Sequence, residues 1–77
     1  MTTASLTPSF VCIVDKENTL YAEIFWPRGE LGAPYPQWWD LRTCKFRLDT
    51  APTDEHKQVY QQALDALESA IKAKNAR

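Results

Sequence analysis

A cysteine–histidine pair is the one catalytic arrangement that the residue inventory suggests, because the chain has two cysteines, Cys12 and Cys44, and a single histidine, His56. In such a pair the imidazole takes the thiol proton and creates a nucleophilic thiolate. Both cysteines fall on predicted strands at positions that face the core, whereas His56 falls in the first turn of a predicted helix. The pattern therefore indicates two buried, reduced thiols and no catalytic residues, so we expect a protein that is not an enzyme.

The same three side chains are the candidate metal ligands, and they occur singly along the chain. A structural zinc site takes four ligands, which are commonly delivered in pairs such as C-x-x-C. A pair of carboxylates can also act in acid–base catalysis. Asp54 and Glu55 are the candidates, but they are adjacent at a helix start, where a favourable interaction with the helix dipole accounts for them. Neither Gly29 nor Gly32 belongs to a phosphate-binding motif. We therefore expect no metal site and no cofactor.

Aromatic residues gather around the middle of the chain. Three tryptophans exceed what a core this small can bury completely, so some of them should be exposed. Tryptophan, tyrosine and arginine are also enriched among the residues that dominate binding energy in protein interfaces. The predicted partner-binding residues are Trp26, Arg28, Tyr35, Trp38 and Trp39. The alternative is structural: by strand alternation, one of Trp38 and Trp39 fills the core while its neighbour covers the sheet edge.

Two short runs of strand-forming residues, 10–14 and 19–26, predict a β-hairpin around the polar stretch 15–18. Alternation along the second run gives one apolar face, made by Leu20, Ala22, Ile24 and Trp26. The opposite face is mixed and carries Tyr21, Glu23 and Phe25. A face of this kind is either covered by a loop or offered to a partner.

A long loop is expected at residues 27–37, which hold both glycines and three of the five prolines. Strand character returns over residues 38–48. We interpret about Leu41 to Leu48 as the third strand, with Lys45 and Arg47 facing water. The alternative for residues 38–43 is that they continue the loop.

The last third of the chain predicts one long amphipathic helix over residues 53–75. Thr53 has the side chain of an N-cap residue, and two acidic residues follow it where the helix dipole favours them. Apolar residues then recur with the helical period, at Tyr60, Leu64, Leu67 and Ile71. This stripe should pack on the apolar face of the sheet.

These elements predict a single α+β domain over residues 1–77, in the order β-β-β-α. A small antiparallel β-sheet, formed by the β-hairpin plus the third strand within residues 9–48, packs against one long C-terminal amphipathic helix. Residues 1–8 are expected to be a loose leader. Apolar residues at 44% and charged residues at 25% are close to the averages of globular proteins.

Charge and hydropathy narrow the function classes. The 9 basic and 10 acidic side chains nearly cancel, giving a formal charge of -1, and they are interspersed, which disfavours binding to nucleic acid or to an anionic membrane. No apolar run approaches the ~20 residues of a membrane span, and the N-terminal residues lack the pattern of a signal peptide. We expect a cytoplasmic protein.

The function that these features favour is that of a small, non-enzymatic protein–protein interaction module. It would be an accessory or inhibitor protein that binds a cellular or host protein through exposed aromatic side chains. One alternative is a homodimeric structural protein, in which a sheet edge or helix end pairs with its own copy. A less favoured alternative is a module that binds single-stranded nucleic acid. The basic residues Arg28, Arg42, Lys45 and Arg47 lie near the aromatic residues, as such binding requires, but acidic residues alternate with them and disfavour a continuous positive groove.

Overall fold

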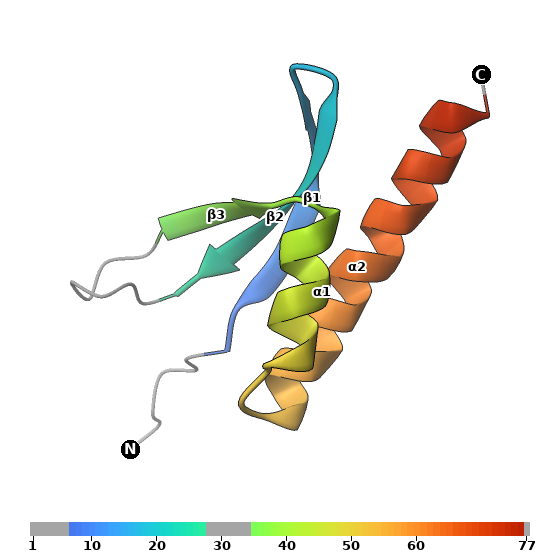
Figure 1. The fold of residues 1–77 in the computed structure, drawn as a ribbon. Helices are drawn as coiled ribbons and strands as arrows, with labels where there is room; N and C mark the ends of the chain where they lie inside the picture. The colour runs from blue at the N-terminus through green and yellow to red at the C-terminus, as the bar shows by residue number, and fades with distance from the viewer. Residues whose placement is uncertain (1–6, 28–34, 77) are drawn as a thin grey trace.

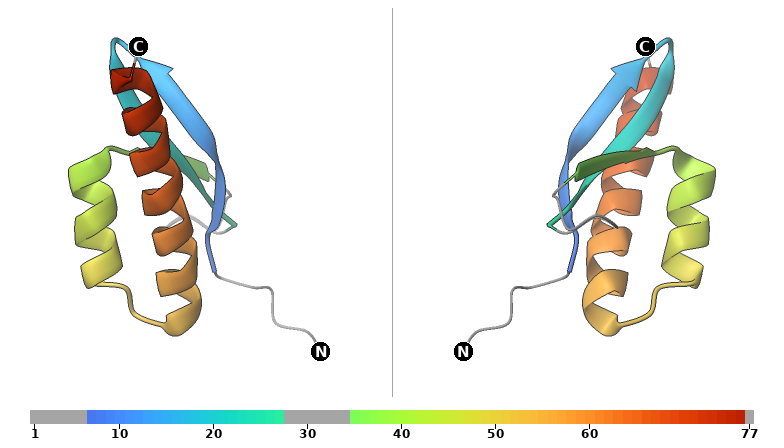
Figure 2. Two further views of the ribbon diagram at one scale, coloured as in Figure 1. Left: turned by 90° about the vertical axis from the view of Figure 1, so that its right-hand side faces the viewer. Right: turned by 90° about the vertical axis from the view of Figure 1, so that its left-hand side faces the viewer.

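Three antiparallel strands and two helices make up the fold in the computed structural model, which describes residues 7–27 and 35–76. In chain order they are β1 (Ser9–Lys16), β2 (Thr19–Trp26), β3 (Tyr35–Trp39), α1 (Leu41–Asp49) and α2 (Asp54–Asn75). The strands form one sheet in the order β1-β2-β3. The helices run antiparallel and side by side on one face of it (Figures 1 and 2). The predicted α+β class is confirmed, with one additional helix before the long one.

The predicted β-hairpin is present, and its turn is shorter than the polar stretch at residues 15–18. Lys16 pairs with Thr19, which leaves Glu17 and Asn18 as a two-residue turn. Both have positive φ angles, 52° and 70°, as a type I′ turn requires. Asn tolerates this left-handed region, whereas Glu17 occupies it at an energetic cost.

A β-bulge at Val11 changes which side chains of β1 face the helices. Phe10 pairs with Ile24 and Cys12 pairs with Glu23, so Val11 is the extra residue. Because directly paired residues of antiparallel strands share a face, the bulge places Cys12 on the same side as Glu23. The expectation that Cys12 is buried is therefore wrong, and its thiol is exposed.

The prediction that Leu41 to Leu48 forms the third strand is also wrong, because this segment is helical in α1. The third strand is β3, which starts inside the predicted loop 27–37 and pairs with β2. Residues 28–34 of that loop and residues 1–6 of the predicted leader lie outside the described residues.

The helix α1 forms because its core-facing residues repeat with a helical period. They stand at positions i, i+3 and i+7: Leu41, Cys44 and Leu48. Asp40 is the N-cap residue, since its carboxylate accepts a hydrogen bond from the backbone N–H of Thr43 at 2.8 Å. A strand would have placed Phe46 on the same face as Cys44, but the helix leaves it 62% exposed.

The long C-terminal helix is confirmed, and α2 begins after the predicted N-cap. The Thr53 hydroxyl accepts a hydrogen bond from the backbone N–H of His56 at 3.2 Å. In the predicted stripe the first three residues are buried and the last is half-buried: Tyr60, Leu64, Leu67 and Ile71. They meet Ala22 and Ile24 of β2, which are fully buried, so the core lies between α2 and the middle strand.

Replacing Thr53 with Ala should lower the free energy of unfolding by about 1 kcal/mol, because the His56 N–H loses its acceptor. In a domain of this size the loss corresponds to about 4–8 °C in the midpoint of a thermal melt followed by circular dichroism. Ser69→Ala is the control, since it removes a hydroxyl from an exposed position within α2. An equal loss in both variants would argue against the capping role.

Candidate functional site on the outer face of the sheet

The two faces of the sheet differ in what lies over them. Both helices pack on one side (Figure 2), and in the described part of the chain no helix lies over the opposite side, which we call the outer face. Its side chains come from alternate positions of the three strands: Ser9, Cys12, Val14, Lys16, Thr19, Tyr21, Glu23, Phe25, Pro36 and Trp38. Trp38 is 45% exposed and Phe25 is 37% exposed. The outer face is therefore an aromatic surface open to contact.

The indole of Trp38 is held in one orientation by three neighbours. Its Nε1 donates a hydrogen bond to Glu23 Oε1 at 2.9 Å. Its ring centroid lies 6.2 Å from that of Tyr21, and the ammonium of Lys16 lies 5.1 Å from the ring centroid, within cation–π range. A side chain that is already ordered loses little rotamer entropy when a partner packs against it.

The charges of the outer face are unequally satisfied. The Glu23 carboxylate accepts the Trp38 N–H. Lys16 lies over the Trp38 ring and has no carboxylate partner within residues 7–27 and 35–76, where the single ion pair joins Lys74 to Asp15 at 3.4 Å. The Lys16 ammonium is therefore available to an acidic group of a partner.

The other two tryptophans lie on the inner side of the sheet. Trp26 and Trp39 both donate their indole N–H to Gln37 Oε1, at 3.1 and 3.0 Å. The Trp39 ring meets Tyr60 of α2 edge-on at 5.0 Å, and the Trp26 ring lies 6.3 Å from that of His56. These contacts join β2, β3 and the start of α2, so we assign both tryptophans a structural role.

The five predicted partner-binding residues therefore do not share one surface. Trp38 is on the outer face, whereas Trp39 is buried and Trp26 is half-buried in the inner cluster. Tyr35 opens β3 and pairs with Trp26 through the backbone, and its side chain lies outside the described part. Arg28 also lies outside the described residues.

The sequence pattern does not indicate that Trp38 has Lys16, Glu23 and Phe25 as neighbours. Strand alternation did mark Glu23 and Phe25 as members of a mixed, non-core face. The missing step was the position of β3: with the third strand placed after residue 40, Trp38 had no strand partner, whereas the structure pairs it directly with Glu23.

Cys44 and His56 have separate surroundings. The Cys44 thiol is fully buried and lies 3.9 Å from the backbone carbonyl oxygen of Trp39. Burial raises its pKa to about 11, which disfavours the nucleophilic thiolate. The His56 Nδ1 lies 2.6 Å from the Thr53 hydroxyl oxygen. The imidazole is thus hydrogen-bonded to the N-cap residue of α2, and it is not a hydrogen-bond partner of the Cys44 thiol.

Among residues 7–27 and 35–76, no group of three or more His, Cys, Asp or Glu side chains lies close enough to hold a metal ion. None of the described helices is long and apolar enough to cross a membrane.

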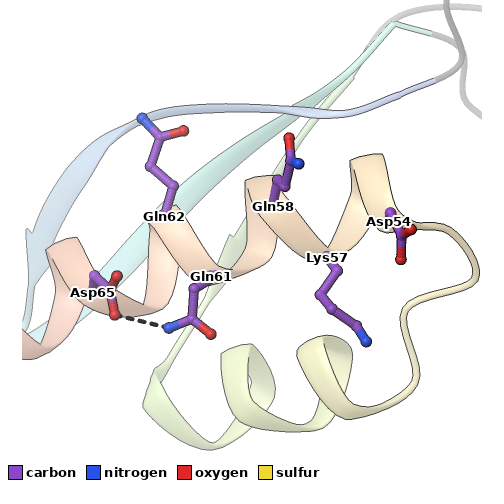
Figure 3. Close-up of a pocket in the computed structure, with 6 residues that line it drawn as sticks. All are labelled: Asp54, Lys57, Gln58, Gln61, Gln62 and Asp65. Atoms are coloured by element: carbon purple, nitrogen blue, oxygen red, sulfur yellow. Dashed lines mark hydrogen bonds between the residues drawn. The ribbon is translucent and has the colours of Figure 1, made fainter.

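A shallow hollow on the exposed side of α2 carries only polar side chains. Its lining residues all belong to that one helix: Asp54, Lys57, Gln58, Gln61, Gln62 and Asp65. Gln58 and Gln62 extend to one side of the helix and Lys57 to the other, so the groups do not converge on a common point (Figure 3). The Gln61 amide donates to the Asp65 carboxylate at 2.8 Å. We interpret this surface as a solvated helix face.

Comparisons with protein-family models, with curated proteins and with solved structures find no match for the chain.

A thiol reagent should modify one cysteine in the native protein and two after denaturation. Cys12 is exposed, whereas Cys44 is buried and burial raises its pKa. A colorimetric disulfide reagent measures the number of thiols, and Cys12→Ser should abolish the native reaction. Two fast-reacting thiols in the native wild type would contradict the placement of Cys44.

Stability should fall as the pH rises from about 9 to about 11. The pKa of Cys44 is raised from 9.0 to about 11 by burial and by the charge of Asp40, so in this interval the unfolded chain releases a proton that the folded protein retains. The contribution of the protonated Cys44 thiol to the free energy of unfolding is fully present below pH 9. By pH 11 the free energy of unfolding should have fallen by about 2–3 kcal/mol. Burial also raises the pKa of Tyr60, which acts in the same direction.

Urea unfolding at a series of pH values measures this loss. Cys44→Ala is the matched variant: it should be less stable at neutral pH and lose less on going to pH 11, since only the Tyr60 contribution remains. The same alkaline loss in both proteins would show that Cys44 is not its source.

Proposed function

We propose that this chain is a small, non-enzymatic protein-binding module, acting as an accessory or inhibitor protein, that contacts a cellular protein through the outer face of its sheet. The observation that supports it most directly is Trp38, which is 45% exposed and yet held by Glu23, Tyr21 and Lys16. Burying an ordered tryptophan gives a large gain in contact area for a small loss of entropy.

Docking on this face is favoured over pairing of the sheet edges with a second copy. The edge strand β3 contains Pro36, which has no N–H to donate to a further strand. The other edge strand, β1, is interrupted by the bulge at Val11, a feature that opposes edge-to-edge pairing. Both edges therefore carry features that discourage a homodimer formed by sheet extension.

The outer face is also a poor match for single-stranded nucleic acid. Stacking platforms for bases combine aromatic rings with a basic groove that follows the phosphates. Here the aromatic rings are accompanied by one cation, Lys16, and one anion, Glu23. A cytoplasmic location agrees with the two free cysteines, since thiols stay reduced in that compartment.

Replacing Trp38 with Ala should remove partner binding and leave the fold intact, because the side chain lies outside the core. Phe46→Ala is the matched control: it removes an aromatic ring that is 62% exposed on α1, away from the outer face. Tagged wild type and both variants are used to capture proteins from a lysate of the source organism, with mass spectrometry as the readout. Thermal melts verify that both variants are folded.

The expected result is a captured protein that is retained by Phe46→Ala and lost with Trp38→Ala. Capture that is indifferent to Trp38, in variants with unchanged melts, would contradict the proposed surface. A wild-type protein that captures nothing and elutes as a dimer in light scattering would favour self-association instead.

A further inference from the structure

Resting on the proposed function, we propose that the outer face takes a short extended peptide segment of its partner. The segment places apolar side chains against Phe25 and Trp38 and an acidic side chain against Lys16. The size, the spacing and the charge of the outer face each bear on this choice of occupant.

The size of the face fits a peptide better than a folded second copy. Three strands spaced about 4.8 Å apart give a width of roughly 14 Å, and strands of five to eight residues at about 3.3 Å each give a length of roughly 17–26 Å. The area is therefore on the order of 300 Å², well below the ~800 Å² that each partner contributes to a standard stable interface. A segment of about six residues in extended conformation would cover its length.

The spacing of the exposed rings matches that of an extended chain. Phe25 pairs with Pro36, and Trp38 lies two residues further along β3, so the two rings are diagonal neighbours on one face. Diagonal cross-strand neighbours are about 7–8 Å apart. Alternate residues of an extended peptide are separated by about 6.6 Å. Two side chains on the same side of such a peptide can therefore contact Phe25 and Trp38 together.

The order of groups across the outer face sets where the charge should fall. Phe25 is paired with Pro36, Trp38 is paired with Glu23, and Lys16 is paired with Thr19 beside the hairpin turn. The Lys16 side chain reaches back from there, so that its ammonium lies 5.1 Å from the centroid of the Trp38 ring. The Glu23 carboxylate already accepts the Trp38 N–H, whereas Lys16 has no carboxylate partner among the described residues. A carboxylate on the peptide, beyond its two apolar residues, would complete the pairing of Lys16.

The test is a selection from a random peptide library displayed on phage, carried out in parallel on four folded proteins. These are the wild type, Trp38→Ala, Lys16→Glu and the control Lys45→Glu, which reverses an exposed charge on α1. Wild type and Lys45→Glu should enrich the same sequences, with apolar residues at alternate positions and an acidic residue near one end. Lys16→Glu should enrich a basic residue at that end, and Trp38→Ala should enrich nothing above background.

A synthetic peptide of the enriched sequence gives the affinity. Lys16→Met keeps the aliphatic stem over the Trp38 ring and removes the charge, so it should weaken binding by about two- to fivefold, as expected for an exposed ion pair. The difference between wild type and Lys16→Met should shrink at high salt.

Failure of this inference can be told apart from failure of the proposed function. Peptides that depend on Trp38 but show no acidic preference, or no change with Lys16→Glu, would overturn the inference and leave the proposed function in place. If no peptide depends on Trp38 and light scattering finds a dimer that Trp38→Ala dissociates, the occupant is a second copy. If the face instead binds a random oligonucleotide in a manner lost with Lys16→Glu, the occupant is nucleic acid; either result would overturn both proposals.

Discussion

Two tryptophan N–H groups in a partly buried position on the inner side of the sheet share one acceptor, the side-chain oxygen of Gln37. An indole N–H removed from water without a partner costs about 1–3 kcal/mol. Because Gln37 must face inward to accept them, the alternation of β3 is set: Trp39 also faces inward, onto Tyr60, and Trp38 faces outward. The packing of the core and the composition of the outer face thus depend on the same strand parity.

The parts of the fold that follow from local sequence could be predicted. The hairpin has two strand-forming runs around a polar turn, and α2 has an N-cap and a long apolar stripe. The segment 41–48 was harder, because Cys44, Phe46 and Leu48 also alternate as a strand would require. A helix of nine residues spans only about two and a half turns, so its apolar period repeats too few times to be distinguished from the alternation of a strand. The N-cap residue Asp40 is the signal that distinguishes the two.

The candidate site could be predicted only in part. Exposure of a tryptophan followed from the small size of the core, but the choice among the three depends on a long-range pairing that places Trp38 opposite Glu23. The exposure of Cys12 depends on the bulge at Val11, and a single extra residue in a strand of apolar residues leaves no compositional mark. Tertiary pairing, which is absent from any short window of sequence, decided both.

The order of the elements also bears on how the chain folds. The hairpin β1–β2 and the helix pair α1–α2 each join neighbours in the sequence through a short connection, so each can form with a small loss of loop entropy. Bringing the two units together closes contacts across most of the chain, such as that between Lys74 and the backbone carbonyl oxygen of Asn18. Docking of the β-hairpin and the helix pair is therefore the step that we expect to limit the folding rate.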